Sequence, residues 1–291
     1  MCRITTQMYT QEITRKHRTA FIIAIDRSAS MQEMIRMGRR QMSKSQAVTL
    51  ITSSLIQEFI DRCRRTDALR NYYDIAIVGY GDDQVEMLLG DEGFVAIDKL
   101  AERQAMPYAI SYEQYDESGE RENVEQTMPL WFEPKAMGNT PLYEAFVKIK
   151  DIVHSWCSDE RNAESFPPIV INITDGEYSD CNPNDLRDIV ATIRREGTQD
   201  GGVLMFNIHL SHDNDLRSLI FPTAEELRGV NSATQLIAEL SSTMPEIFNA
   251  AIAELKGKEH KAPYRAMGYN ANIVELISIL NIGSRCGPTL Q

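Results

Sequence analysis

Three groups of small oxygen-bearing side chains stand out along this 291-residue sequence. The first follows the apolar run TAFIIAID and consists of Asp26, Ser28 and Ser30. The second is Thr140, which directly precedes an amphipathic segment, and the third is Asp175, which follows the apolar run PIVINIT. Ligands of open α/β sheets bind at the carboxyl ends of the strands, so we expect the three groups to converge at one edge of a sheet.

The residue types of this set match a hard divalent cation. Three hydroxyls and two carboxylates supply oxygen without nitrogen or sulfur, which suits Mg²⁺ or Mn²⁺. Mg²⁺ takes about six oxygens in an octahedral array and keeps some of its waters. Two formal negative charges neutralise a dication without exceeding it, which leaves one coordination position for a carboxylate from outside the chain.

The apolar patterns around these groups predict strands that alternate with helices. Short apolar runs indicate buried strands at residues 19–26, 72–80, 168–174 and 203–210. A Gly-Asp-Asp turn predicts that residues 84–89 return as a hairpin partner, which adds one antiparallel edge strand. Such alternation favours an α/β fold with a mostly parallel sheet covered by helices on both faces.

Helices are expected after most of these strands. Apolar residues at four-residue spacing predict a helix over residues 44–64, which Ser43 and Gln46 are placed to cap. Further helices are expected over residues 142–156 and 183–193 and near 233–241, 245–256 and 272–281. The Met- and Arg-rich residues 31–42 are expected to form a loop, and the acidic residues 91–128 an insertion at the surface.

The charge of the chain argues against several classes of function. There are 42 acidic and 30 basic residues, a formal net charge of −12, whereas binders of nucleic acid or anionic membranes need clustered Lys and Arg. The apolar run at residues 20–25 is too short for a spanning helix or a secretory leader. Five widely spaced cysteines without a CxxC pair predict free thiols, and we expect a cytoplasmic protein.

Taken together, the three groups resemble the metal-ion-dependent adhesion site (MIDAS) of von Willebrand factor A (VWA) domains. That site consists of DxSxS, a distant Thr and a distant Asp, and the five residues stand here in the family's order. The flanks match as well, with Gly-x-Thr-Pro-Leu around the threonine and Thr-Asp-Gly-Glu around the second aspartate. Three shorter stretches are similar to bacterial stand-alone VWA proteins of the tellurite-resistance type: residues 131–134, 221–222 and 239–242.

The resemblance implies a particular domain organisation. A VWA domain with a doubly wound, mostly parallel six-stranded sheet would occupy residues 17–256 and contain the acidic insertion 91–128. Residues 1–16 would be an N-terminal extension. Residues 257–291 would be a C-terminal helical extension packed on the domain.

The resemblance also implies roles for the site residues. Ser28 and Ser30 would coordinate Mg²⁺ or Mn²⁺ directly, and Thr140 directly or through water. Asp26 and Asp175 would act largely through waters and orient the hydroxyls. The implied function is a non-catalytic interaction module whose metal binds an Asp or Glu of a partner protein. The implied setting is a bacterial stress-response or signalling system, sometimes encoded beside a protein kinase and a phosphatase.

A metal-dependent hydrolase or phosphotransferase on a similar sheet is the alternative. A phosphatase of the haloacid dehalogenase type needs a second Asp two residues after its nucleophile, where this sequence has Ser28. No GxxxxGK[ST] phosphate loop occurs, and no GxSxG elbow accompanies a plausible Ser–His–acid set. We therefore expect no catalytic activity. The intact five-residue set also argues against a scaffold that has lost its metal.

Other features admit a structural and a functional interpretation. His209 and His212 form an HxxH pair, which needs a turn between the two rings to share a metal. Glu177 and Asp180 lie in a strand-to-helix turn, where loop ordering and helix capping are favoured over a role behind the metal. The acidic residues 91–128 are most simply a solvated insertion, and the sharper hypothesis is a docking surface for a basic partner.

Overall fold

A mostly parallel sheet forms the centre of the protein. The computed structural model describes residues 8–37, 39–66, 68–90, 93–115, 120–176, 178–210, 218–257 and 262–283. Five parallel strands form the middle of the sheet in these residues: β1 (Thr19–Asp26), β4 (Tyr73–Gly81), β9 (Ile169–Thr174), β12 (Leu204–Leu210) and β14 (Met267–Ala271). Short antiparallel strands extend it at both edges: β5 (Gln84–Met87), β6 (Val95–Ala96) and β13 (Leu219–Ile220).

The strand order identifies the topology. Along the sheet the order is β13-β14-β12-β9-β1-β4-β5, with β6 also paired to β4. The order of the chain reverses between β1 and β9, which makes this pair the switch point of a doubly wound sheet. The predicted fold class is therefore confirmed, and the predicted hairpin of β4 and β5 is present. The described sheet also contains the two-residue strands β6 and β13, which the sequence did not indicate.

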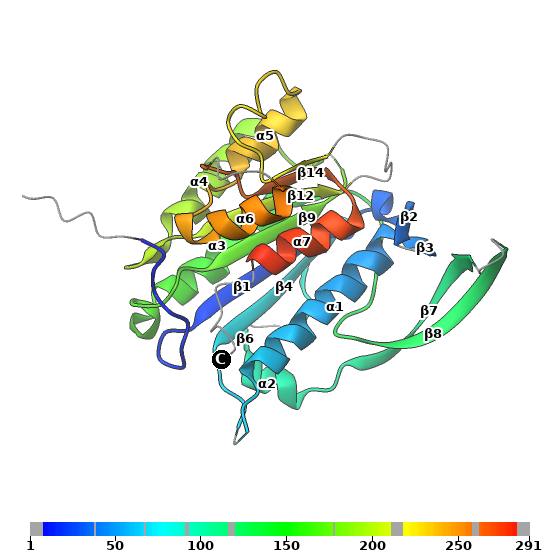
Figure 1. Cartoon of the computed structure of the whole chain (residues 1–291), viewed down its shortest axis with the longest axis horizontal. Helices are drawn as coiled ribbons and strands as arrows, with labels where there is room; N and C mark the ends of the chain where they lie inside the picture. The colour runs from blue at the N-terminus through cyan, green and yellow to red at the C-terminus, as the bar shows by residue number, and fades with distance from the viewer. Residues whose placement is uncertain are drawn as a thin grey trace, which may run out of the picture.

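Helices cover both faces of the sheet (Figure 1). One face carries α1 (Lys44–Cys63), α2 (Ile97–Glu102), α6 (Asn249–Lys256) and α7 (Ile273–Gly283). The other carries α3 (Leu142–Cys157), α4 (Pro183–Arg195) and α5 (Ser232–Leu240). A second sheet is described below. The remaining described elements are short 3₁₀ turns and a small hairpin: η1 (Ala29–Gln32), η2 (Glu160–Asn162), η3 (Glu246–Phe248), β10 (Gly197–Thr198) and β11 (Gly201–Gly202).

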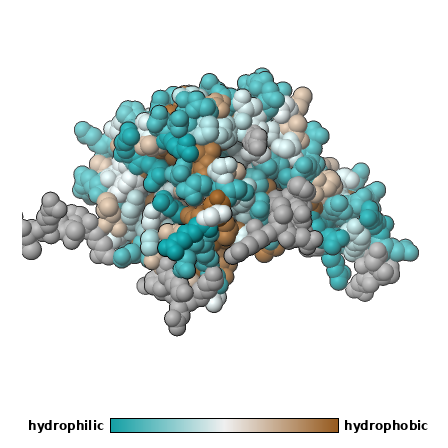
Figure 2. Space-filling view, turned by 90° about the horizontal axis from the view of Figure 1, so that it is seen from above, coloured by the Kyte–Doolittle hydropathy of each residue, from teal (hydrophilic) through white to brown (hydrophobic). Residues whose placement is uncertain are grey.

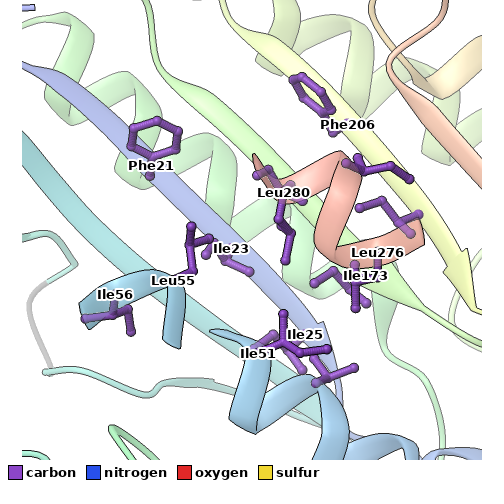
Figure 3. Close-up of a cluster of buried hydrophobic side chains, with 14 of the residues drawn as sticks. Phe21, Ile23, Ile25, Ile51, Leu55, Ile56, Ile173, Phe206, Leu276 and Leu280 are labelled. Atoms are coloured by element: carbon purple, nitrogen blue, oxygen red, sulfur yellow. The ribbon is translucent and has the colours of Figure 1, made fainter. Parts of the chain in front are cut away.

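The side chains of β1 alternate between two hydrophobic cores. Phe21, Ile23 and Ile25 pack toward α1 and α7, where Figure 3 shows them beside side chains of both helices. The intervening Ala20, Ile22 and Ala24 belong to the cluster under α3 and α4. Every residue of β1 is buried, as expected for a parallel strand covered on both faces. Each buried Ile or Phe contributes about 1.5–3 kcal/mol relative to an exposed side chain.

Two helices begin where local sequence signals place them. Ser43 caps α1, and its hydroxyl accepts from the backbone N–H of Gln46 while the Gln46 side chain accepts from the N–H of Ser43. Asn182 caps α4 in the same reciprocal way with Asp185, and proline follows it at the first helical position. The predicted cap of α1 by Ser43 and Gln46 is therefore confirmed.

Residues 31–42 do not form the loop expected from their composition. They contribute η1 and a hairpin of β2 (Met34–Met37) and β3 (Arg40–Ser43). This hairpin joins β7 (Met106–Tyr115) and β8 (Arg121–Leu130) in a second, four-stranded sheet. The β7–β8 ribbon projects from the body of the protein in Figure 1. One face of the ribbon is largely exposed, whereas the face that carries Ile110 and Tyr112 packs against the core, so the ribbon is amphipathic and not solvated on both faces.

The C-terminal part of the chain also differs from the prediction. Residues 257–291 were expected to form a helical extension, yet β14 lies between β12 and β13 in the main sheet. Its sequence MGYNA has few residues that favour strands, so its conformation depends on pairing with neighbouring strands. Helix α7 follows β14 and buries Leu276, Ile279 and Leu280 in the core. The end of the described chain is thus part of the domain.

The face seen in Figure 2 is mostly hydrophilic, and hydrophobic residues show mainly in a patch near its middle. None of the helices in the described ranges is both long and apolar enough to span a membrane. Cys63, Cys157 and Cys181 are free thiols, whereas Cys2 and Cys286 lie outside the described residues.

Gly81, the last residue of β4, is expected to be intolerant of a side chain. A Cβ added there would lie 2.4 Å from the carbonyl oxygen of Arg27 and 3.0 Å from the backbone nitrogen of Ser28. We predict that Gly81→Ala lowers the free energy of unfolding by about 1–3 kcal/mol, because the loop after β1 must move. Urea titration followed by circular dichroism measures the change.

Gly90→Ala is the matched control. The nearest atom to a Cβ at Gly90 is a side-chain nitrogen of Arg103 at 3.6 Å, an ordinary contact. This variant should change the free energy of unfolding by less than about 0.5 kcal/mol. Equal losses in the two variants would contradict the steric explanation.

Candidate metal centre

The predicted site residues lie at the switch point of the sheet. β1 ends at Asp26 and its neighbour β9 ends at Thr174, so the loops that follow start side by side. Asp26 is fully buried, and Ser28 is 2% exposed. The first loop carries the serines and the second begins with Asp175.

Four of the five predicted residues are linked by direct contacts. The hydroxyl oxygens of Ser28 and Ser30 lie 3.1 Å apart. The Ser30 hydroxyl donates to Oδ1 of Asp175 at 2.7 Å. Oδ1 of Asp26 accepts from the backbone N–H of Ser28 at 2.8 Å, which fixes the turn after β1. The structure therefore brings the DxSxS motif and the distant aspartate into one cluster of oxygen atoms.

The loop that contains Thr140 is fastened to the loop after β1 by backbone hydrogen bonds. The N–H of Met137 donates to the carbonyl of Arg27 at 2.7 Å, and the N–H of Ala29 donates to the carbonyl of Gly138 at 3.0 Å. Gly138 has a φ of +63°, and a Cβ there would lie 2.5 Å from Cα of Asp82. Glycine is therefore required for this close approach.

Thr140 itself is buried and is held through its backbone. The hydroxyl of Ser179 accepts from the N–H of Thr140 at 3.1 Å. The carbonyl of Thr140 accepts from the backbone N–H of Ser179 at 3.1 Å. The structure thus brings Thr140 to the same edge of the sheet. The bonds that position it are those of its backbone, whereas the other four residues are linked through side-chain atoms.

Asp26 is a carboxylate held in a buried position. Its Oδ2 accepts from the hydroxyl of Thr174 at 2.6 Å. Burial raises the pKa of Asp26, and the hydrogen bonds from Ser28 and Thr174 oppose that shift. The free energy of unfolding of the metal-free protein therefore falls as the pH rises through the raised pKa of Asp26, because the buried carboxyl must then become charged. Thr174 was not singled out from the sequence, although it directly precedes Asp175 in the matching flank.

Lys44 is a buried side chain at the candidate site that was not singled out from the sequence. Its ammonium lies 2.6 Å from Oδ2 of Asp175 and 2.6 Å from Oε2 of Glu33. The side chains of Lys44 and Asp175 are 2% and 0% exposed, so this ion pair is removed from solvent. A lysine is almost never buried to this extent unless it is paired.

The pair changes the charge of the centre. Two carboxylates were expected to be available to a dication, but the ammonium of Lys44 already neutralises one of them. A signal was present in the sequence, because Lys44 is the first residue of α1 and the helix dipole disfavours a cation there. A lysine at that position requires compensation by nearby carboxylates, which Glu33 and Asp175 provide.

The chemistry of the donors fits a hard cation. No group of three or more His, Cys, Asp or Glu side chains is placed to hold a metal among the residues with described positions. Hydroxyls must therefore supply much of the ligand set, which suits Mg²⁺ or Mn²⁺ better than Zn²⁺. Gly176 leaves room beside the donors, since a Cβ there would lie 3.4 Å from the Ser30 hydroxyl.

The other predicted features have separate outcomes. Oδ2 of Asp180 accepts from the N–H of Glu144 in the first turn of α3, so it contacts the start of the preceding helix, whereas Asn182 caps the helix that follows its turn. Glu177 lies outside the described residues. His209 stacks on Tyr269, with ring centroids 4.7 Å apart. His212 lies outside the described residues, so a metal shared by the two histidines stays a hypothesis.

Comparison with known proteins adds similarities of fold. No family model and no curated protein matches the sequence of this chain. Similar solved structures include a von Willebrand factor type A protein from Catenulispora acidiphila (12% identity, TM-score 0.40), the SpRpn10 VWA domain (11%, 0.41) and the vWF domain of the type V pili tip protein Mfa5 from Porphyromonas gingivalis (9%, 0.45).

The alignments differ in extent. They cover 77%, 77% and 93% of this chain, which in turn spans 41%, 83% and 95% of the three structures. At such low identities and TM-scores, the architecture is defined by the chain's own strand order. The fold and the site together define a doubly wound α/β protein with an oxygen-lined centre at its switch point.

Replacing Lys44 tests the role of the buried ion pair. We predict that Lys44→Met lowers the free energy of unfolding in EDTA by about 3–5 kcal/mol, because Asp175 stays buried without its cation. The double variant Lys44→Met/Asp175→Asn should recover much of this loss. Urea unfolding of the three proteins measures both effects.

Lys99→Met is the control for the loss of a lysine. The Lys99–Glu102 pair is exposed on α2, and pairs of this kind contribute about 0–1 kcal/mol. If Lys44→Met costs no more than Lys99→Met, then Lys44 does not compensate Asp175.

Proposed function

We propose that this protein is a VWA-type interaction module that binds a partner protein through a divalent metal. Its metal site comprises Asp26, Ser28, Ser30, Thr140 and Asp175, and the metal is Mg²⁺ or Mn²⁺. The observation that carries the proposal is the unbroken series of contacts from Asp26 through the two serines to Asp175 at the switch point. The strand order and the family-like sequence flanks support it.

The residues of the site divide into two roles. The hydroxyls of Ser28 and Ser30 are close enough together to bind one cation directly. Asp26 orients the first loop, because its two oxygens accept from the N–H of Ser28 and the hydroxyl of Thr174. When bound, the metal supplies a positive charge that attracts a carboxylate from outside the chain, and that carboxylate can fill the remaining coordination position.

The proposed partner is a protein that presents an Asp or Glu to this site. The resemblance to tellurite-resistance-type VWA proteins extends the proposal to a bacterial multi-protein stress-response or signalling system in the cytoplasm. A kinase or phosphatase of the same system is the candidate partner. The net negative charge of the chain disfavours nucleic acid and anionic membranes as partners.

We propose no catalytic activity for this site. Hydrolysis needs a nucleophile or a general base within reach of the substrate. Both oxygens of Asp26 accept hydrogen bonds, and those of Asp175 contact the Ser30 hydroxyl and the Lys44 ammonium. These carboxylates are engaged in holding the site, which favours the interaction module over the hydrolase or phosphotransferase.

Metal binding should be visible as added stability. A ligand present at about 100 times its Kd adds roughly 2.7 kcal/mol to a folded state that alone binds it. We predict this gain with Mg²⁺ for the wild type and its loss in Asp26→Ala, whose metal-free stability falls little because burial already disfavours the charged carboxylate. Thermal melts with Mg²⁺ or EDTA measure the gain.

The exposed Asp188→Ala on α4 provides the control and should keep the full Mg²⁺ effect. An equal Mg²⁺ shift in the wild type and in Asp26→Ala would mean that the ion acts elsewhere.

Partner binding should depend on the same site. We predict that EDTA and Thr140→Ala each release a partner that the wild type retains in Mg²⁺, because both remove part of the metal's coordination. Affinity capture followed by binding measurements on the identified protein tests this, with Thr192→Ala on the exposed side of α4 as control. The adhesion mechanism is wrong if binding survives both treatments. If the wild type hydrolyses a phosphate ester and Asp26→Ala does not, the result would favour the hydrolase or phosphotransferase instead.

A further inference from the structure

A cavity of about 220 Å³ adjoins the metal centre. It lies between the ends of β9 and β12 and helices α4 and α5, on the face of the sheet opposite α1. Thr174, Asp175 and Gly176 line it, so the cavity and the metal centre share a wall. We call this space the switch-point pocket.

The floor of the switch-point pocket is unusually polar for the interior of a sheet. Three cross-strand pairs of β9 and β12 lie on the same face: Val170 with Met205, Asn172 with Asn207, and Thr174 with His209. The pairs change from apolar to polar as the strands approach the metal centre. Asn172 and Asn207 are only 2% and 3% exposed, yet both line the pocket.

A directed chain of hydrogen bonds holds the two asparagines. The Tyr80 hydroxyl donates to Oδ1 of Asn172 at 2.7 Å, and Nδ2 of Asn172 donates to Oδ1 of Asn207 at 3.3 Å. Nδ2 of Asn207 then donates to the Ser241 hydroxyl at 3.3 Å. Burying an amide is costly unless it is hydrogen-bonded, and this chain of bonds offsets that cost for both asparagines. Each amide nitrogen also carries a second N–H that a ligand can use.

The rest of the lining is apolar, aromatic and without net positive charge. Leu236 of α5 and Tyr178 form part of the walls. The ring of His209 stacks on Tyr269 with an interplanar angle of 19°, and burial lowers the pKa of His209, which favours its neutral form. Asp175 is already paired with Lys44. These features favour a neutral aromatic group over an ion.

We propose that the switch-point pocket takes a tyrosine-like side chain from the same partner segment that brings the carboxylate to the metal. This inference rests on the proposed function, because the shared wall makes the two sites continuous. The size is adequate, since an apolar cavity of about 150 Å³ in another protein accommodates benzene. The aromatic lining fits the ring, and the asparagine floor fits the hydroxyl.

Small probes separate the pocket from the metal. The full-length protein is titrated by NMR with p-cresol, with acetate, and with 3-(4-hydroxyphenyl)propionate, which carries both groups. We expect p-cresol to bind with or without Mg²⁺. The bifunctional probe should bind at least about tenfold more tightly than p-cresol in Mg²⁺, because its second contact is intramolecular. In EDTA this gain should vanish.

Two matched comparisons locate the binding. Ala233 is exposed on α5 and lines the pocket, so Ala233→Trp should abolish p-cresol binding while the Mg²⁺ stabilisation stays. Gln235→Trp places the same group at another exposed position of α5 and should leave p-cresol binding unchanged. Replacing the bifunctional probe with 3-phenylpropionate should weaken binding several-fold, because the hydroxyl is lost.

Each failure has a distinct meaning. If p-cresol does not bind while Mg²⁺ still stabilises the protein and acetate binds only with Mg²⁺, the pocket holds water alone and this inference is overturned. If p-cresol binds but Mg²⁺ adds nothing for either carboxylate probe, the proposed function fails and the link to a partner fails with it. Equal affinities for the probes with and without the hydroxyl would overturn the role of the asparagine floor.

Discussion

Burial of negative charge at the switch point is the constraint on which the site depends. Asp26 and Asp175 are removed from water at the ends of adjacent strands, and an unpaired charge there would be costly. The protein compensates them differently. Asp26 receives hydrogen bonds from Ser28 and Thr174, whereas Asp175 is paired with the buried ammonium of Lys44.

This compensation couples the site to the fold. Lys44 begins α1, so the helix that covers one core is fastened by its first residue to the loop after β9. Tyr80 extends from β4 across β1 to reach Asn172 of β9. Burial and the nearby Asp26 raise its pKa well above the ordinary range, so Tyr80 stays a neutral donor. The centre is thus held by elements from both faces of the sheet.

The arm of β2, β3, β7 and β8 is a separate structural layer with its own means of stabilisation. The buried Ile110 and Tyr112 anchor it to the core, and the guanidinium of Arg40 lies 4.8 Å from the centre of the Tyr112 ring. That cation–π contact gives Arg40 a structural role. The opposite face of the ribbon is largely exposed. The stretch 91–128, which was expected to be a surface insertion, also contributes β6 to the main sheet and buries Ile97 and Leu100 of α2 in the core.

The sequence by itself determined the parallel strands up to β12, the capped start of α1 and the grouping of the candidate site residues, because these depend on local periodicity and short motifs. β14 depended on tertiary structure, since its residues favour a strand only when β12 lies beside them. The same is true of the β2–β3 hairpin, which pairs with a ribbon some 70 residues further along the chain. The contact between Lys44 and Asp175 joins residues 131 positions apart. No local pattern encodes that distance, and only the packing of α1 against the switch point placed a cation beside the site.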